Sequence, residues 1–286
     1  MILTKKKFIL NADDFGLSTA INKAVTEGMN TGLLKSVSLV ANGVAYDDAV
    51  DKIIPQYPEL GIGIHLNVTE GYSLCQDLTT LTDTNNRFIN NYWQLLIKSY
   101  NKNEKDFFED LEREFRRQIE KILSKTKVTH IDSHQHIHSI PKIFELVCRL
   151  AKEYNIKQIR THFEKFYIVP EVHRHFNKIY PRNIIKTSLY GLFTIINEST
   201  LHKYELKTND YLIGLLYNSL IDALAVSYGL MAIKYNNMVV ETVVHPSRYE
   251  DGTIDDRFKE YLLIKNKKLI DKIKSLGYEI TNYAEE

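Results

Sequence analysis

Short apolar runs alternate with longer amphipathic segments along most of the chain. Runs of four to eight apolar residues are typical of buried strands, and apolar residues at three- and four-residue steps are typical of helices. Strands that alternate with helices predict a parallel sheet built from βα units. Strands are predicted at 7–14, 36–40, 60–68, 128–137, 157–161, 237–244 and 277–281, and helices at 18–29, 47–54, 105–125, 141–154 and 258–275.

Two stretches do not follow this alternation. Residues 72–103 are polar and loop-like, apart from a short apolar patch at Tyr92 and Trp93. Residues 163–235 are rich in aromatic side chains, and we interpret them as a divergent, partly helical insertion region. No internal repeat and no linker rich in Pro, Gly or Ser divides the chain. We therefore expect a single α/β domain over 1–286, a distorted, TIM-barrel-like (β/α) barrel with parallel strands.

Composition and charge narrow the class of protein. The 286 residues include 37 Lys and Arg against 36 Asp and Glu, a formal net charge of +1. Such a balance provides no overall field to attract nucleic acid or an anionic membrane, so neither is expected as a partner. The sequence has no run of about 18 uncharged apolar residues and no recognisable signal peptide. With two cysteines only, Cys75 and Cys148, the expected location is the reducing cytoplasm.

Side chains that can carry chemistry gather where the predicted strands end. Parallel strands bring their carboxyl ends to one edge of the sheet, where the sites of β/α folds lie. Asp13 and Asp14 follow the first apolar run directly. Adjacent carboxylates repel each other, and the functional interpretation is that one binds a cation while the other stays ionised as a base. A turn or a helix cap is the structural alternative.

Histidines occupy the corresponding positions of later strands. His65 lies near the end of the third predicted strand and His245 directly after a late one, and each alone has a structural alternative. The range 130–138 holds four histidines and one aspartate. In an extended strand, alternate residues share one face, so these side chains are predicted to form one row. The row consists of His130, Asp132, His134, His136 and His138.

Carboxylate and imidazole together point to a divalent metal. A set of one aspartate and two histidines leaves a coordination position open, which is typical of catalytic rather than structural sites. Such a metal lowers the pKa of bound water and polarises a carbonyl oxygen. A free carboxylate can then accept a proton from the water, and a histidine can protonate the leaving group. This combination suits the hydrolysis of an amide or an ester.

Four motifs resemble those of the YdjC-like carbohydrate deacetylases, a family that includes chitooligosaccharide deacetylases. They are NADDFGLS at 11–18, GIHLNVTEG at 63–71, THIDSHQHIH at 129–138 and VVHPS at 243–247, in the family's order. The resemblance implies a barrel-like β/α fold and one divalent metal ion, Mg or Zn. It also implies a hydrolase that removes the acetyl group from an N-acetylated sugar or chitooligosaccharide, giving acetate and a free amino sugar.

The resemblance assigns roles to individual residues. It implies that Asp14, His65 and His134 hold the metal. It further implies that Asp13 is the general base, and that His245 is the histidine placed beside the site as an acid. One departure is Gln135, which stands where many relatives have the middle of three consecutive histidines.

Four further residues are expected either to support the metal ligands or to contact the substrate. His136 and Asp132 are expected to orient the metal ligands. Asn67 and Arg160 follow neighbouring predicted strands, where each could bind a sugar hydroxyl or stabilise an oxyanion, with ordinary loop contacts as the alternative. The aromatic range 165–235 is expected to select the substrate.

Two other functions remain open at this stage. Another metal-dependent amidohydrolase or phosphoesterase would also use a His-x-His pair, and a non-catalytic sugar-binding relative would keep the fold. The expected partner is a small N-acetylated sugar. A homodimer is the default assembly, because symmetric dimers are the commonest oligomers.

Overall fold

All described strands belong to one parallel sheet with an irregular, curled shape. The computed structural model describes residues 6–102, 104–170 and 179–285. The strand order is β5-β4-β3-β2-β1-β7-β6, and β8 pairs with the first residues of β1. The strands are β1 (Lys6–Phe15), β2 (Ser36–Leu39), β3 (Gly61–Leu66), β4 (His130–Ser133), β5 (Gln158–Ile159), β6 (Tyr211–Ile213), β7 (Val239–Val244) and β8 (Tyr278–Thr281).

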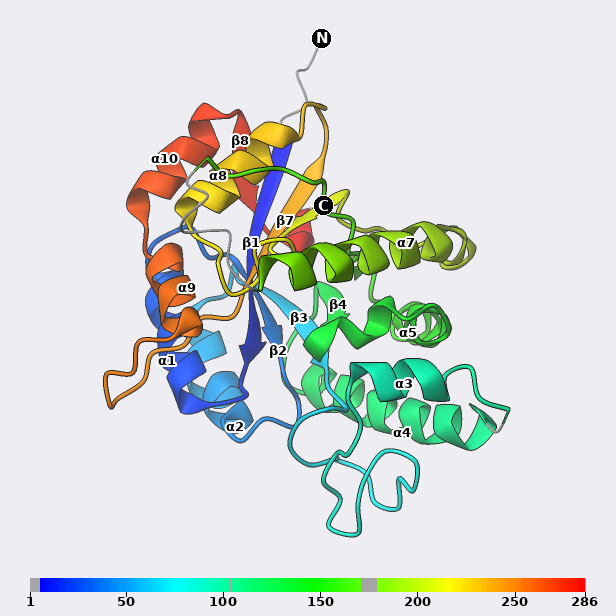
Figure 1. Ribbon diagram of the computed structural model, residues 1–286. Helices are drawn as coiled ribbons and strands as arrows, with labels where there is room; N and C mark the ends of the chain where they lie inside the picture. Colours follow the sequence, from blue (N-terminus) through cyan, green and yellow to red (C-terminus); the bar gives the residue numbers. More distant parts are fainter. Residues whose placement is uncertain (1–5, 103, 171–178, 286) are drawn as a thin grey trace.

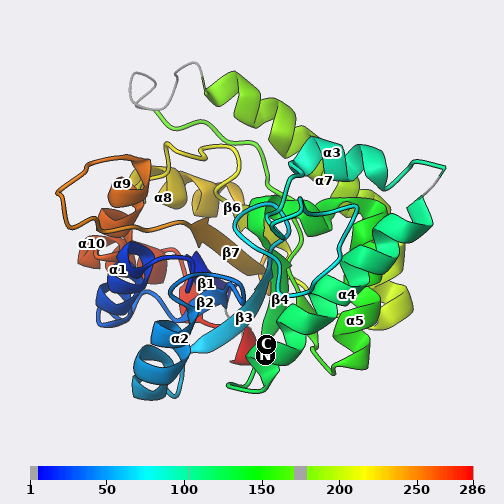
Figure 2. The same cartoon turned by 90° about the horizontal axis from the view of Figure 1, so that it is seen from below.

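Helices surround the sheet on both sides (Figure 1), and a view turned by 90° shows them as a ring around the strands (Figure 2). None of the helices in the described ranges combines the length and apolar character needed to cross a membrane. The helices are α1 (Thr19–Met29), α2 (Tyr46–Asp48), α3 (Tyr92–Lys98), α4 (Glu104–Leu123), α5 (Pro141–Glu153), α7 (Tyr180–Tyr204), α8 (Ala223–Ala232), α9 (Asp256–Ile264) and α10 (Lys267–Ser275).

The two ends of the strand order approach each other. Lys207, just before β6, accepts a hydrogen bond from the backbone N–H of Ile159 at 3.0 Å and donates one to the carbonyl of Lys157 at 2.9 Å. Further along, the N–H of Leu212 donates to the carbonyl of Phe163 at 2.8 Å. These bonds join the β5 and β6 edges through irregular backbone, so the predicted distorted, barrel-like fold with parallel strands is confirmed.

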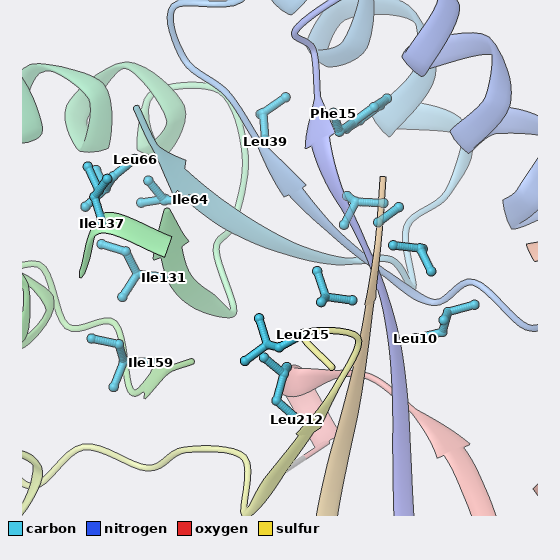
Figure 3. Close-up of a cluster of buried hydrophobic side chains, with 14 of the residues drawn as sticks. Leu10, Phe15, Leu39, Ile64, Leu66, Ile131, Ile137, Ile159, Leu212 and Leu215 are labelled. Atoms are coloured by element: carbon cyan, nitrogen blue, oxygen red, sulfur yellow. The ribbon is translucent and has the colours of Figure 1, made fainter. Parts of the chain in front are cut away.

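Alternation along the strands separates an apolar face from a polar face. The apolar side chains pack in one buried cluster beneath the helices, and Figure 3 shows part of it, including Leu10, Ile64 and Ile131. The intervening residues of the same strands are polar and buried. They are Asn11, Asp13, Ser38, His65, His130 and Asp132. The inner face of the curled sheet therefore carries a polar network.

The structure corrects the predicted strand at 128–137. Strand β4 ends at Ser133, and His134–Ser139 forms a 3₁₀ turn in which Gln135 and His136 have φ of 53° and 57°. The predicted row of five side chains along one strand is therefore wrong beyond Asp132, although His134 still reaches the same edge of the sheet. The sequence pattern gave no warning, because such φ values usually fall on Gly or Asn.

Other elements differ from their predictions for local reasons. The range 72–103 is not wholly loop, because Asn91 and Gln94 form a capping box that starts α3. The predicted helix 258–275 is two helices, since the side chain of Asn266 caps a new helix by accepting from the N–H of Lys268. The range 47–54 mixes α2 with a π-turn and a 3₁₀ turn. Residues 163–235 contain α7, β6 and α8, and β6 pairs with β7 in the sheet.

Candidate metal centre and active site

The two neighbouring aspartates point in different directions because the backbone bends between them. Asp14 has φ of 65°, and the register of β1 against β2 shifts between Ala12 and Phe15. A left-handed conformation at a residue other than glycine costs on the order of 1–2 kcal/mol and persists where the surroundings enforce it. Here the bend turns Asp13 toward Arg160 and Asp14 toward His134.

Asp14, His65 and His134 form a compact, buried cluster. The Oδ1 atom of Asp14 lies 2.7 Å from Nδ1 of His134 and 3.4 Å from Nε2 of His65. One potential ligand atom from each residue lies within 4.8 Å of the other two. The second oxygen of Asp14, Oδ2, is buried and accepts no hydrogen bond, although the guanidinium of Arg257 lies 2.9 Å away. One carboxylate and two imidazoles, with ligand atoms this close together, fit a divalent cation.

Each histidine of the cluster is oriented by a carboxylate on its opposite ring nitrogen. His65 Nδ1 lies 2.8 Å from Oδ1 of Asp132, which leaves Nε2 facing Asp14. His134 Nε2 lies 3.1 Å from Oε2 of Glu70, which leaves Nδ1 facing Asp14. Carboxylates in this position fix the ring orientation and tautomer of metal-binding histidines. The structure thus places Asp132 where the sequence expected an orienting residue and adds Glu70.

The carboxylates around the cluster create a negative potential, which favours a positive charge at its centre. Burial alone would lower the pKa of His65 and His134, but Asp132 and Asp14 outweigh it and raise the values to about 10 and about 9. Burial would raise the pKa of Asp14, yet His134 and His65 hold it well below its usual value. A divalent cation would satisfy the same negative potential and displace the imidazole protons.

A second group, formed by Asp13, His65 and Asp132, also has ligand atoms within 4.8 Å of one another. It already contains a cation, because the guanidinium of Arg160 lies 2.7 Å from both Asp13 and Asp132. It also shares His65 with the first group. Within the described ranges, the geometry therefore favours one metal ion rather than the two of a binuclear hydrolase.

Arg160 lies beside Asp13 and contacts site carboxylates. Its side chain is fully buried and contacts three carboxylates, Asp13 in a bidentate pair at 2.7 and 2.8 Å, Asp132, and Glu241 at 2.6 Å. A guanidinium occupied in this way cannot reach a sugar. Of the two roles expected for Arg160, the geometry favours support of a site residue over a sugar contact, because the guanidinium holds the carboxylate of Asp13.

Asn67 is also buried, and its side chain hydrogen-bonds backbone groups of the turn that follows it. Its Oδ1 accepts from the N–H groups of Thr69 and Glu70 at 3.1 Å each, and its Nδ2 donates to the carbonyl of Glu70 at 2.8 Å. The proposed sugar contact is therefore corrected here as well. Asn67 shapes the turn that brings Glu70 to His134. His136 does not contact the ligand cluster and lines the cavity beside it, hydrogen-bonded to His162.

His245 also lies near Asp13. Its Nε2 is 4.0 Å from Oδ2 of Asp13, and its Nδ1 is 3.5 Å from Oε2 of Glu260, a residue of α9. The same Glu260 oxygen also accepts the backbone N–H of His245. Burial would lower the pKa of His245, but Glu260, Asp13 and Asp14 raise it above its ordinary value. Glu260 could not be predicted from the sequence. The helical pattern of α9 does not show which of its acidic residues contacts a strand end that is distant in the sequence.

A cavity of about 490 Å³ opens over these groups. Asp13, His134, His136 and His245 line one part of it. The opposite part comes from α3 and α7, outside the sheet. These residues are Tyr92, Trp93, Asn183, Lys186, Leu189 and Tyr190. The aromatic patch at 92–93 and the range 165–235 therefore reach the space where a substrate would lie.

Replacement of Glu260 by glutamine tests its influence on His245. With the acid role that the sequence resemblance implies for His245, we expect kcat to fall about 10- to 100-fold with little change in KM, because Glu260 no longer orients the imidazole. Loss of the negative charge lowers the pKa of His245, so the alkaline limb of the kcat profile should move to lower pH. Steady-state kinetics across pH measure both effects, and Glu250→Gln, in the exposed loop before α9, is the control. An unchanged alkaline limb contradicts the coupling.

The fold and the cluster together define a parallel β/α protein with a candidate mononuclear metal centre at the carboxyl ends of its strands. A family model described as YdjC-like protein matches residues 7–275. The chain belongs to this family.

Two curated relatives named carbohydrate deacetylase are similar to part of the chain. The chain is 41% identical over 151 residues to a carbohydrate deacetylase of Clostridium beijerinckii, covering 52% of this chain and 58% of the relative. It is 41% identical over 157 residues to carbohydrate deacetylase 1 of Listeria innocua, covering 54% of this chain and 61% of the relative. The chain thus spans less than two thirds of the length of these relatives.

The fold is similar to that of two solved structures. One is a protein of Enterococcus faecalis V583 described provisionally as a cellobiose-phosphate cleavage protein, with a TM-score of 0.76, 21% identity and coverage of 99% of both chains. The other is a protein of Agrobacterium tumefaciens C58 described as uncharacterized, with a TM-score of 0.54 and 10% identity, covering 100% of this chain and 91% of that one. At these identities the likeness concerns the fold.

Proposed function

We propose that the protein is a metal-dependent carbohydrate deacetylase, which hydrolyses the acetamido group of an N-acetylated sugar to acetate and a free amino sugar. The observation that carries the proposal is the cluster of Asp14, His65 and His134, with Asp13 and His245 beside it at one cavity. Relatives named carbohydrate deacetylase support the choice of substrate.

Asp14, His65 and His134 would hold the cation, which when bound acidifies water and polarises the acetyl oxygen. Asp13 accepts a proton from the attacking water. The clamp of Arg160 and the hydrogen bond from Asn11 at 2.7 Å keep its carboxylate in place. The water oxygen bonds to the acetyl carbon, and the C–N bond then breaks.

His245 protonates the departing amine nitrogen. Burial opposes the charged imidazole, but Glu260 and Asp13 raise the pKa of His245 above its ordinary value, which favours the protonated form that a general acid needs. His245 Nε2 and Asp13 Oδ2 are 4.0 Å apart, so the acid and the base can both reach the acetamido group of one bound sugar. The proton that Asp13 removes from water and the proton that His245 gives to nitrogen balance the hydrolysis.

Two imidazoles and one carboxylate favour zinc over magnesium, since magnesium prefers oxygen ligands and retained water. We propose zinc as the physiological ion. The cytoplasmic location and the homodimer stay predictions.

A substrate screen tests the function. Chelator-stripped protein is incubated with N-acetylated mono-, di- and trisaccharides, with and without added zinc or magnesium, and acetate is measured. We expect acetate release that is lost on stripping and restored by the cation, because the cation activates the water. Phosphate release from phosphoesters would favour the alternative hydrolase. Binding of sugar without acetate release over hours would favour a non-catalytic relative.

A further inference from the structure

His136 lies in the cavity wall with a backbone conformation that few side chains adopt. Gln135 and His136 have φ of 53° and 57°, in the left-handed region. Two consecutive residues of this kind, neither of them glycine, require that the surrounding structure hold them. The conformation takes His136 out of the strand direction of β4, and its side chain lines the cavity together with His134.

The side chain of His162 contacts the ring of His136. Nε2 of His162 lies 3.2 Å from Nδ1 of His136. His162 is 1% exposed, its backbone N–H donates to Oγ1 of Thr194 on α7, and its ring packs against His138 and Tyr190. It does not line the cavity. His162 is therefore a buried partner, held by several contacts, for a histidine that lines the cavity.

The bond between the two rings determines what His136 presents to the cavity. A hydrogen bond between two ring nitrogens needs one of them protonated and the other not, so the contact at 3.2 Å holds the ring of His136 in place and couples its Nδ1 to Nε2 of His162. Nδ1 and Nε2 of a neutral imidazole have opposite roles. Among the described residues, none hydrogen-bonds Nε2 of His136. That atom is available to a ligand in the cavity.

We propose that His162 is a positioning residue, which orients His136 so that Nε2 of His136 hydrogen-bonds a hydroxyl or acetamido group of the bound sugar. This inference rests on the proposed deacetylase function and extends it. Neither the strand pattern nor the family motifs marked His162. It follows β5 in an irregular segment, and only the barrel brings it next to the turn at 134–139.

A double-mutant cycle tests the inference. His162→Phe keeps an aromatic ring and removes the hydrogen bond, and His136→Phe removes the contact itself. We expect each to lower kcat/KM about tenfold, as for one lost hydrogen bond, while bound zinc is unchanged. The double variant should be no worse than His136→Phe alone, because His162 acts only through His136. His162→Gln should recover part of the loss, and exposed His202→Gln on α7 is the control.

Losses that multiply in the double variant would overturn the proposal, since His162 would then act independently. A second readout needs no activity. Two-bond ¹H–¹⁵N spectra of the imidazoles report which ring nitrogen carries the proton, and His162→Phe should change the pattern of His136. If the protonation pattern of His136 were unchanged in His162→Phe, the proposed coupling between the two histidines would be wrong. A wild type that shows the coupling but releases no acetate contradicts the deacetylase function alone.

Discussion

Asp13→Asn is expected to lower kcat about 10²- to 10⁴-fold while leaving the bound metal unchanged. The amide nearly preserves the shape of the side chain and cannot accept the proton of water. Asp13 contacts Arg160, Asn11 and His245, whereas Asp14 is the aspartate that faces both His65 and His134. Catalysis and metal binding should therefore separate at two adjacent residues.

Acetate release and metal content of the same preparation measure this separation. Asp271→Asn, an exposed aspartate on α10, controls for the change of residue type. Thermal unfolding of both variants shows whether the fold is intact. If Asp13→Asn kept full activity, another group would be the base. If it lost the metal, Asp13 would belong to the ligand set.

Arg160→Met is expected to have the largest effect on stability. The methionine has similar volume and no charge, so it would leave three buried carboxylates, Asp13, Asp132 and Glu241, without their cation. Removing one partner of a buried ion pair typically costs 3–5 kcal/mol. We expect the free energy of unfolding to fall by about 3–5 kcal/mol.

Denaturant unfolding measures this loss, with a chelator present so that metal binding does not add to stability. Arg257→Met is a matched control, because Arg257 also contacts an aspartate of the site, Asp14, but its side chain is 34% exposed. Its loss should cost less than the loss of Arg160, because the guanidinium of Arg257 is partly exposed and pairs with one carboxylate rather than three. Equal effects of the two substitutions would contradict the view that Arg160 neutralises the buried face.

Strand ends were the part of the site that the sequence could predict. Asp14 and His65 follow apolar runs, and parallel pairing brings such positions to one edge without any knowledge of the loops. His134 was found for a partly wrong reason. The expected strand stops at Ser133, and the turn, rather than alternation along a strand, carries His134 to Asp14.

The supporting residues could not be found in this way. Glu260 lies on a helix, Glu70 in a turn shaped by Asn67, and His162 in irregular chain after β5. Their positions depend on how helices and loops pack against the barrel, which periodicity does not encode. Arg160 was singled out correctly as a residue of the site, but its burial among three carboxylates became visible only in the closed sheet.

Metal binding by three forms of the protein tests the central claim, that Asp14 holds a cation with His65 and His134 while Asp13 remains free to act as a base. Equilibrium dialysis with zinc compares chelator-stripped wild type, Asp13→Asn and Asp14→Asn. We predict one tightly bound zinc ion in the wild type and in Asp13→Asn, and affinity weakened about a hundredfold or more in Asp14→Asn. Wild-type affinity in Asp14→Asn would contradict the account.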